Sequence, residues 1–191
     1  IYKDRIWGGS KLKDFLDKDI PSQTTGESWE IADFPDDNSI VTNGEFAGES
    51  IKKILNQFGP QILGTKIIEN FGNCFPLLFK FLDAKEDLSI QLHPNDELAK
   101  KRHNSFGKTE MWYIMQADKD AEIIVGFDQD SSAEEYLTHL KNKTLPSILK
   151  RIKVSPGEVY YLETGTIHAI GKGIVIAEIQ QTSDITYRVY D

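Results

Sequence analysis

Apolar and polar residues alternate along the chain from Phe75 to the end. A period of two places successive side chains on opposite faces of a β-strand. Pro156-Gly157 and Gly171–Gly173 interrupt the alternation and predict tight turns between neighbouring strands. The predicted strands cover residues 76–83, 88–92, 110–116, 122–127, 150–154, 158–162, 166–170, 174–180 and 186–190. Many short strands with turns between them predict a mainly β chain, folded as an antiparallel barrel or double-sheet jelly roll.

Helical patterns interrupt these strands in three places. Apolar residues at helical spacing predict a helix over residues 49–58, which Gly59-Pro60 ends. Residues 95–102, directly after a proline, predict a second helix. Residues 131–141 predict a third, because Ser131 and Ser132 each precede a glutamate by three positions, and apolar residues extend this excursion to residue 149 as a short further helix. The first 45 residues are rich in turn formers and predict short strands, for example over 27–32 and 39–42.

Composition narrows the class of protein. The 191 residues are 39% hydrophobic and 27% charged, which excludes a disordered chain and predicts a single domain with a real core. No apolar run approaches the ~18 residues that a membrane span needs. The net charge of −8 makes duplex nucleic acid and acidic membranes poor partners. Cys74 is the only cysteine, so no intrachain disulfide forms; together with the lack of a visible signal peptide, this predicts a cytoplasmic protein.

Three segments carry residues that bind transition metals. Gln91 and His93 share one face of a predicted strand, and Glu110 opens another. His168 ends residues 157–168, which predict a hairpin with a tight inner turn. Each residue alone is typical of an ordinary surface or structural position. Together, two imidazoles and a carboxylate form a ligand set for a divalent transition metal, and Gln91 offers a fourth, neutral oxygen.

Two further histidines and one arginine stand outside this set. His103 lies in a polar loop and His139 on a predicted helix face, and neither has a set of partner ligands. Arg188 stands on the predicted strand 186–190, between β-formers. Its charge requires either solvent at an exposed edge or a polar cavity where the cation has a function. The sequence leaves these two alternatives open.

These segments resemble a known family. Residues 157–168 resemble the second cupin motif, and Gln91, His93 and Glu110 resemble a stretched first cupin motif. The stretched form is similar to type I mannose-6-phosphate isomerase in its shorter bacterial form. The segments that carry this resemblance are Trp7-Gly8-Gly9, Phe75-Pro-Leu-Leu-Phe-Lys80, Leu88-Ser-Ile-Gln-Leu-His-Pro-Asn95, Lys108-Thr-Glu110 and Ser183-Asp-Ile-Thr-Tyr-Arg188-Val-Tyr-Asp191.

The resemblance implies a fold and a site. The fold is a cupin-type antiparallel jelly-roll barrel over residues 1–191, with the helical excursions given above. One zinc ion per chain is held by Gln91, His93, Glu110 and His168, and Arg188 is the catalytic arginine. The family also carries a second, smaller cupin-like domain after the arginine segment, which this sequence lacks, so we expect it to be a fragment of a longer protein.

The implied reaction interconverts mannose 6-phosphate and fructose 6-phosphate through a cis-enediol. A base must move a proton between C2 and C1. Lys108 is the first candidate, because it lies two residues from Glu110, and Glu178 is the alternative. The phosphosugar needs local positive charge and polar contacts, for which Arg188, Lys108 and Ser89 are candidates. Two other functions remain open: a non-haem Fe(II) cupin oxygenase, and a sugar-binding cupin without turnover.

Overall fold

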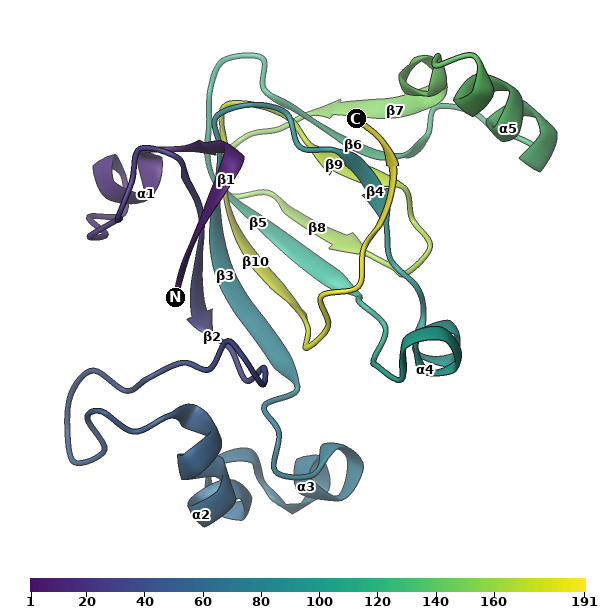
Figure 1. Ribbon diagram of the computed structural model, residues 1–191. Helices are drawn as coiled ribbons and strands as arrows, with labels where there is room; N and C mark the ends of the chain where they lie inside the picture. Colours follow the sequence, from purple (N-terminus) through teal and green to yellow (C-terminus); the bar gives the residue numbers. More distant parts are fainter.

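The computed structural model describes residues 1–191 and consists mainly of two antiparallel β-sheets that face each other (Figure 1). The six-stranded sheet has the order β1-β2-β3-β10-β5-β8, and the five-stranded sheet has the order β11-β4-β9-β6-β7. The strands are β1 (Tyr2–Gly9), β2 (Thr25–Ile31), β3 (Leu77–Ala84), β4 (Ile90–Leu92), β5 (Glu110–Ala117), β6 (Glu122–Phe127), β7 (Leu149–Lys153), β8 (Val159–Leu162), β9 (His168–Ile170), β10 (Ile174–Gln181) and β11 (Tyr187–Tyr190). The predicted jelly-roll architecture is confirmed.

The turns of the second half join the two sheets rather than neighbouring strands. β8 belongs to the six-stranded sheet and β9 to the five-stranded sheet, so the hairpin predicted for residues 157–168 is wrong. Gly171–Gly173 likewise carries the chain from β9 back to β10 in the other sheet. The alternation of apolar residues shows that a strand has one buried face, but it does not show which strand lies beside it.

The core fills the space between the sheets. The larger apolar cluster combines Trp112, Ile114 and Ile176 of the six-stranded sheet with Ile123 and Ile170 of the five-stranded sheet. These side chains are at most 3% exposed. A smaller cluster lies under the third helical excursion and contains Leu145 and Leu149, together with Ile90 of β4. The inner faces therefore supply a rigid frame for polar residues that share them.

The helices are short and lie outside the two sheets (Figure 1). They are α1 (Lys11–Asp14), α2 (Ile51–Leu63), α3 (Thr65–Phe71), α4 (Asp96–His103), α5 (Ala133–Lys141) and the 3-10 helix η1 (Leu145–Ile148). Ser132 and Glu135 form the capping box that starts α5, and Asn95 caps α4. Pro146 lies in the first turn of η1, and Leu149 already begins β7. No helix is both long and apolar enough to cross a membrane.

Two details of the predicted first helix need correction. Gly59-Pro60 does not end the helix. The dihedral angles of Phe58 are non-helical (φ −129°, ψ 19°), which kinks the helix, but the chain continues as a helix beyond this point. Proline lacks the N–H that would bond to the preceding turn, which explains a kink at this point. The helix ends instead at Gly64, whose φ of 83° is readily available only to glycine. The following α3 was not predicted, since none of its residues is buried.

The first 45 residues also differ from the prediction. β1 and α1 were not predicted, and the strand expected over 39–42 does not form. Ile40 makes only an isolated bridge to Ser50, because the chain turns back through Asn43 and Gly44 before a ladder can grow. β1 is an edge strand whose Ile6 is almost fully exposed while Lys3 and Arg5 are half-buried, so apolar residues do not mark its inner face.

Candidate metal centre and cavity

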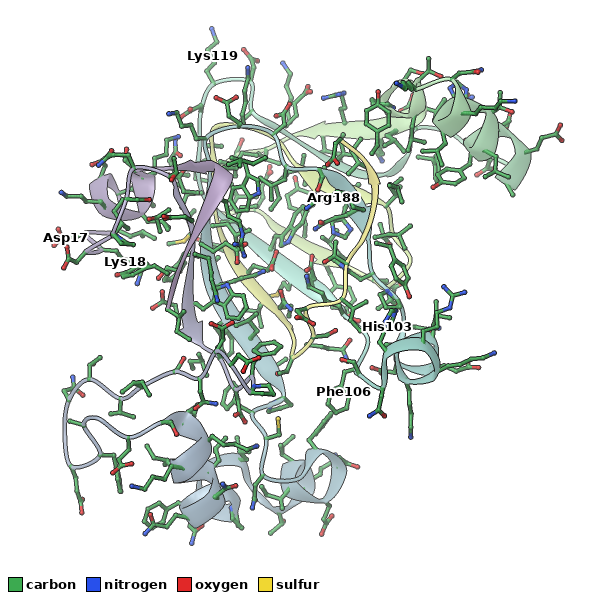
Figure 2. The ribbon with its side chains drawn as sticks, viewed as in Figure 1. Asp17, Lys18, His103, Phe106, Lys119 and Arg188 are labelled. Carbon is green, nitrogen blue, oxygen red and sulfur yellow. The ribbon has the colours of Figure 1, made fainter.

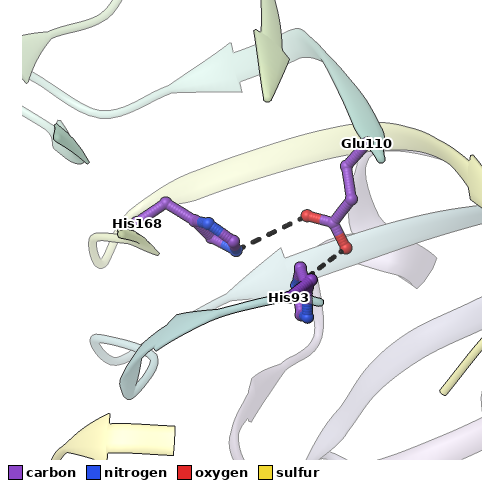
Figure 3. A group of neighbouring side chains, drawn as sticks. All are labelled: His93, Glu110 and His168. Carbon is purple, nitrogen blue, oxygen red and sulfur yellow. Dashed lines mark ion pairs between the residues drawn. The ribbon is translucent and has the colours of Figure 1, made fainter. Parts of the chain in front are cut away.

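Three predicted ligands meet between the two sheets (Figure 3). His93 follows β4, Glu110 begins β5 and His168 begins β9. The Nε2 of His93 lies 3.3 Å from Glu110 Oε1, and the Nε2 of His168 lies 3.6 Å from Glu110 Oε2. The three side chains are at most 2% exposed, and their ligand atoms all lie within 4.8 Å of one another.

Backbone carbonyl groups fix the orientation of both imidazoles. His93 Nδ1 lies 3.0 Å from the carbonyl oxygen of Ile185, and His168 Nδ1 lies 2.8 Å from that of Thr166. A carbonyl oxygen only accepts, so Nδ1 donates in each case and Nε2 of the neutral ring presents a lone pair to Glu110. Burial lowers the pKa of His168 to about 4, which keeps this imidazole neutral near pH 7.

The cluster leaves buried polar atoms without partners. His93 Nε2, His168 Nε2 and Glu110 Oε2 form no hydrogen bond. Buried polar atoms are nearly always paired, and three acceptors turned toward one another repel. A cation among them removes that repulsion. Imidazole nitrogens that donate their other N–H to a carbonyl, together with a carboxylate, are the donor set of a divalent metal site. The residues therefore fit a metal ion.

Lys108 lies beside this cluster. Its Nζ is 3.3 Å from Glu110 Oε1, and the residue is only 6% exposed, so it is not a solvated loop lysine. Burial alone would raise the pKa of Glu110, but the charge of Lys108 holds that pKa well below its usual range. Glu110 is therefore a carboxylate, the form that binds a metal.

A cavity of about 360 Å³ opens onto Glu110, a volume that suits a small ligand. Gln91 and Ser89 line it, and Gln91 stands opposite His168 in the pairing of β4 with β9. Its role as a metal ligand remains a prediction. The charged residues of the cavity wall are Arg5, Lys80, Lys108, Arg188, Glu27, Glu110 and Glu178. A metal ion would make this wall strongly positive and suited to an anionic substrate.

Glu178 lies deep in the cavity wall with two partners. Lys80 Nζ is 2.7 Å from its Oε1 in a buried ion pair, and the indole N–H of Trp112 donates to its Oε2 over 2.8 Å. Burial and then the charge of Glu110 raise the pKa of Glu178. Burial lowers the pKa of Lys80, but the carboxylates of Glu178, Glu27 and Glu110 outweigh it and raise that pKa above its ordinary value.

Three cavity residues carry charges that the sequence pattern did not predict. Lys80 stands between Leu78 and Leu82 on the inner face of β3, and Glu27 accepts from Arg5 Nε at 2.8 Å. A signal for Lys80 existed: a single cation within an apolar face, the pattern noted for Arg188. Arg5 and Glu27 offered no such signal, since their strands do not alternate clearly.

Arg188 combines the two alternatives left open by the sequence. It lies on β11 and lines the cavity (Figure 2), but its side chain is 65% exposed and its Nε is 3.7 Å from Asp191 Oδ1. It is therefore an exposed cation at the cavity mouth. His103 bonds the hydroxyl of Tyr187 and His139 that of Thr144, and neither belongs to the metal cluster.

Comparison with known proteins agrees with this geometry. ManA, a mannose-6-phosphate isomerase of Bacillus subtilis (strain 168), is 45% identical over 192 residues, which cover 100% of this chain and 59% of that protein. The crystal structure of the mannose 6-phosphate isomerase from Bacillus subtilis matches with a TM-score of 0.89 and 40% identity, over 100% of this chain and 59% of that one. A structure described as mannose 6-phosphate isomerase bound with zinc and yttrium shares the fold, with a TM-score of 0.75 and 18% identity, over 99% and 68%.

The chain thus spans about 59% of the length of the Bacillus subtilis relative. The family description "Phosphomannose isomerase type I, catalytic domain" matches residues 1–129. This segment contains β1 to β6, and with them His93, Lys108 and Glu110. The chain therefore belongs to the type I phosphomannose isomerase catalytic-domain family.

Proposed function

We propose that this chain is the catalytic domain of a metal-dependent aldose–ketose isomerase, which interconverts mannose 6-phosphate and fructose 6-phosphate through a cis-enediol. The observation that carries the proposal is the cluster of His93, Glu110 and His168, with three unpartnered buried atoms, whose Glu110 lines a cavity that also presents Lys108 and Arg188. The full-length relatives bear the name of this activity, and we propose that a further domain completes the protein here, as the resemblance implies.

Zinc is the metal that we propose. His93, Glu110 and His168 would hold it, with Gln91 as a fourth ligand, and one ion would serve each chain. When bound, zinc supplies a Lewis acid that stabilises negative charge on a carbonyl oxygen. The donor set of two imidazoles and a carboxylate supports this choice, as does the shared fold of the zinc-containing isomerase.

Lys108 is the base that we propose for the proton transfer. Its Nζ lies beside Glu110 and lines the cavity, within the region where the sugar carbons would lie. Glu178, the alternative, has one oxygen in contact with Lys80 and the other with Trp112, so neither is free to approach a carbon-bound proton. We therefore assign Glu178 to the substrate-binding wall, with Lys80 as its partner.

Arg188 and Ser89 complete the proposed substrate site. Arg188 lies at the mouth, where its guanidinium can reach a phosphate or enediolate oxygen, and planar guanidinium groups bind such oxygens in pairs. The hydroxyl of Ser89 offers a further donor along the same wall. The phosphosugar is thus the small-molecule partner that the cavity charges favour.

A coupled isomerase assay on the full-length protein tests the proposal. We expect turnover of mannose 6-phosphate that a chelator abolishes and added zinc restores. His103→Ala provides a matched control, because this histidine lies outside the cluster and its variant should respond like the wild type. A zinc-loaded protein that binds the sugar phosphate without turnover, or a protein that holds iron and consumes dioxygen, would overturn the proposal.

A further inference from the structure

Gln180 occupies a buried position that the proposed chemistry does not use. It lies on β10, directly opposite Glu110 in the pairing with β5, and is 1% exposed. Its Nε2 donates to the carbonyl oxygens of Ser183 (2.7 Å) and Gln181 (3.0 Å). Both partners only accept, so they determine which end of the amide faces them.

The loop that Gln180 holds ends at the metal site. The Ser183 hydroxyl accepts from the backbone N–H of Ile185 over 3.4 Å, and the carbonyl of Ile185 accepts from His93 Nδ1. His93 and Ile185 are 92 positions apart, so their contact depends on the tertiary placement of this loop. His168, in contrast, finds its carbonyl only two positions away at Thr166, within its own turn.

We infer that Gln180 is a positioning residue for the metal site: its carboxamide fixes the 181–185 loop so that the Ile185 carbonyl holds His93 in the Nδ1–H tautomer. That tautomer turns the Nε2 lone pair toward Glu110. The other end of the amide supports this reading, because Gln180 Oε1 is buried without a partner. An apolar residue would avoid that unpaired atom, so the donor end must carry the advantage. The inference rests on the proposed function only for the identity of the metal.

Gln180→Met tests the inference, because methionine has a similar shape and no donor. In the full-length protein, zinc affinity is measured by competition with a chromophoric chelator. We expect the zinc dissociation constant to rise roughly 10–100-fold, the usual effect of losing a group that orients a ligand. Nitrogen NMR is recorded on the metal-free Gln180→Met protein at about pH 8, above the ordinary pKa of imidazole. It should show that His93 loses its single tautomer while His168 keeps its own.

Thr182→Val is the matched control. Its hydroxyl anchors the same loop to the Phe75 carbonyl over 2.7 Å and forms no hydrogen bond to residues 183–185. We expect near-normal zinc affinity and an unchanged His93 tautomer. If Gln180→Met does not fold, Gln180→Asn, too short to reach both carbonyls, should give the same two changes.

Two results would overturn the inference. One is an unchanged His93 tautomer in both Gln180 variants; the other is an equal loss of zinc affinity in Thr182→Val, which would reveal general loosening of the loop. If the wild type itself bound no zinc, the proposed metal would be wrong. The tautomer measurement would still decide the role of Gln180, since it needs no metal.

Discussion

Replacing Lys80 by methionine should destabilise the protein through Glu178. The two side chains are 9% and 4% exposed, and 2.7 Å separates Lys80 Nζ from Glu178 Oε1. Methionine retains most of the aliphatic volume between Leu78 and Leu82, so little packing is lost. The main effect is electrostatic, because Glu178 keeps only the Trp112 N–H as a partner.

The magnitude follows from the burial of the pair. Removing one member of a buried ion pair costs roughly 3–5 kcal/mol, because the other charge is left without compensation. Glu178 can avoid part of this cost by taking up a proton. Protonation costs about 1.4 kcal/mol for each unit by which the pH exceeds the ordinary glutamate pKa. We therefore expect Lys80→Met to lower the free energy of unfolding by about 3 kcal/mol at pH 7.

The loss of stability in Lys80→Met should increase as the pH rises. Burial, followed by the charge of Glu110, already raises the pKa of Glu178, and removal of Lys80 raises it further. Below the ordinary glutamate pKa of ~4.3, Glu178 is protonated in the folded and unfolded states alike, so the penalty is small. As the pH rises through the folded-state pKa, the unfolded state already holds fewer protons, and the variant loses stability relative to the wild type.

Urea unfolding at about pH 4.5 and pH 7, followed by tryptophan fluorescence, measures this difference. Lys53→Met is the matched control, since Lys53 of α2 forms an exposed pair with Glu49, just before the helix, and its loss should stay within about 0.5 kcal/mol. Adding Glu178→Gln to Lys80→Met should recover part of the loss. A Lys80→Met variant that loses no more stability than Lys53→Met at pH 7, or whose loss shrinks as the pH rises, would contradict this expectation.

Three further predictions concern the site in the full-length protein. His93→Ala and His168→Ala should each lose most of the metal measured by plasma mass spectrometry, whereas His103→Ala and His139→Ala keep it; full metal in all four would contradict the site. Arg188→Ala should reduce turnover by about 100-fold with unchanged metal, and Arg188→Lys should recover little, because a point charge cannot copy a planar fork; near-normal turnover would remove Arg188 from the site. Lys108→Gln should stop exchange of the C2 proton with solvent, and Glu178→Gln should slow it less; the reverse order would make Glu178 the base.

The strands after Phe75 could be predicted because one face of each is buried against the other sheet. The nine predicted segments overlap β3 to β11, and no predicted strand end differs from the observed one by more than two residues. β1 could not be predicted in this way, since its Ile6 points to solvent and its stability comes from pairing with β2. The four-residue α1 and the unburied α3 lack any periodic signal, and their positions depend on tertiary contacts.

The metal ligands and the buried ion pair differ in what the sequence reveals. His93, Glu110 and His168 could be grouped from the sequence alone, because few residue types bind a transition metal and the family motif gives their order. Lys80 and Glu178 are common residue types, and their contact depends on which strands lie side by side. β3 and β10 are distant in the sequence, yet their register sets Lys80 directly opposite Glu178, and that of β10 with β5 sets Glu178 opposite Trp112. A shift of one residue would turn Glu178 to the outer face. The register of β10 therefore places Glu178 and Gln180 on the inner face together, one in the cavity wall and the other bonded to the loop that contacts His93.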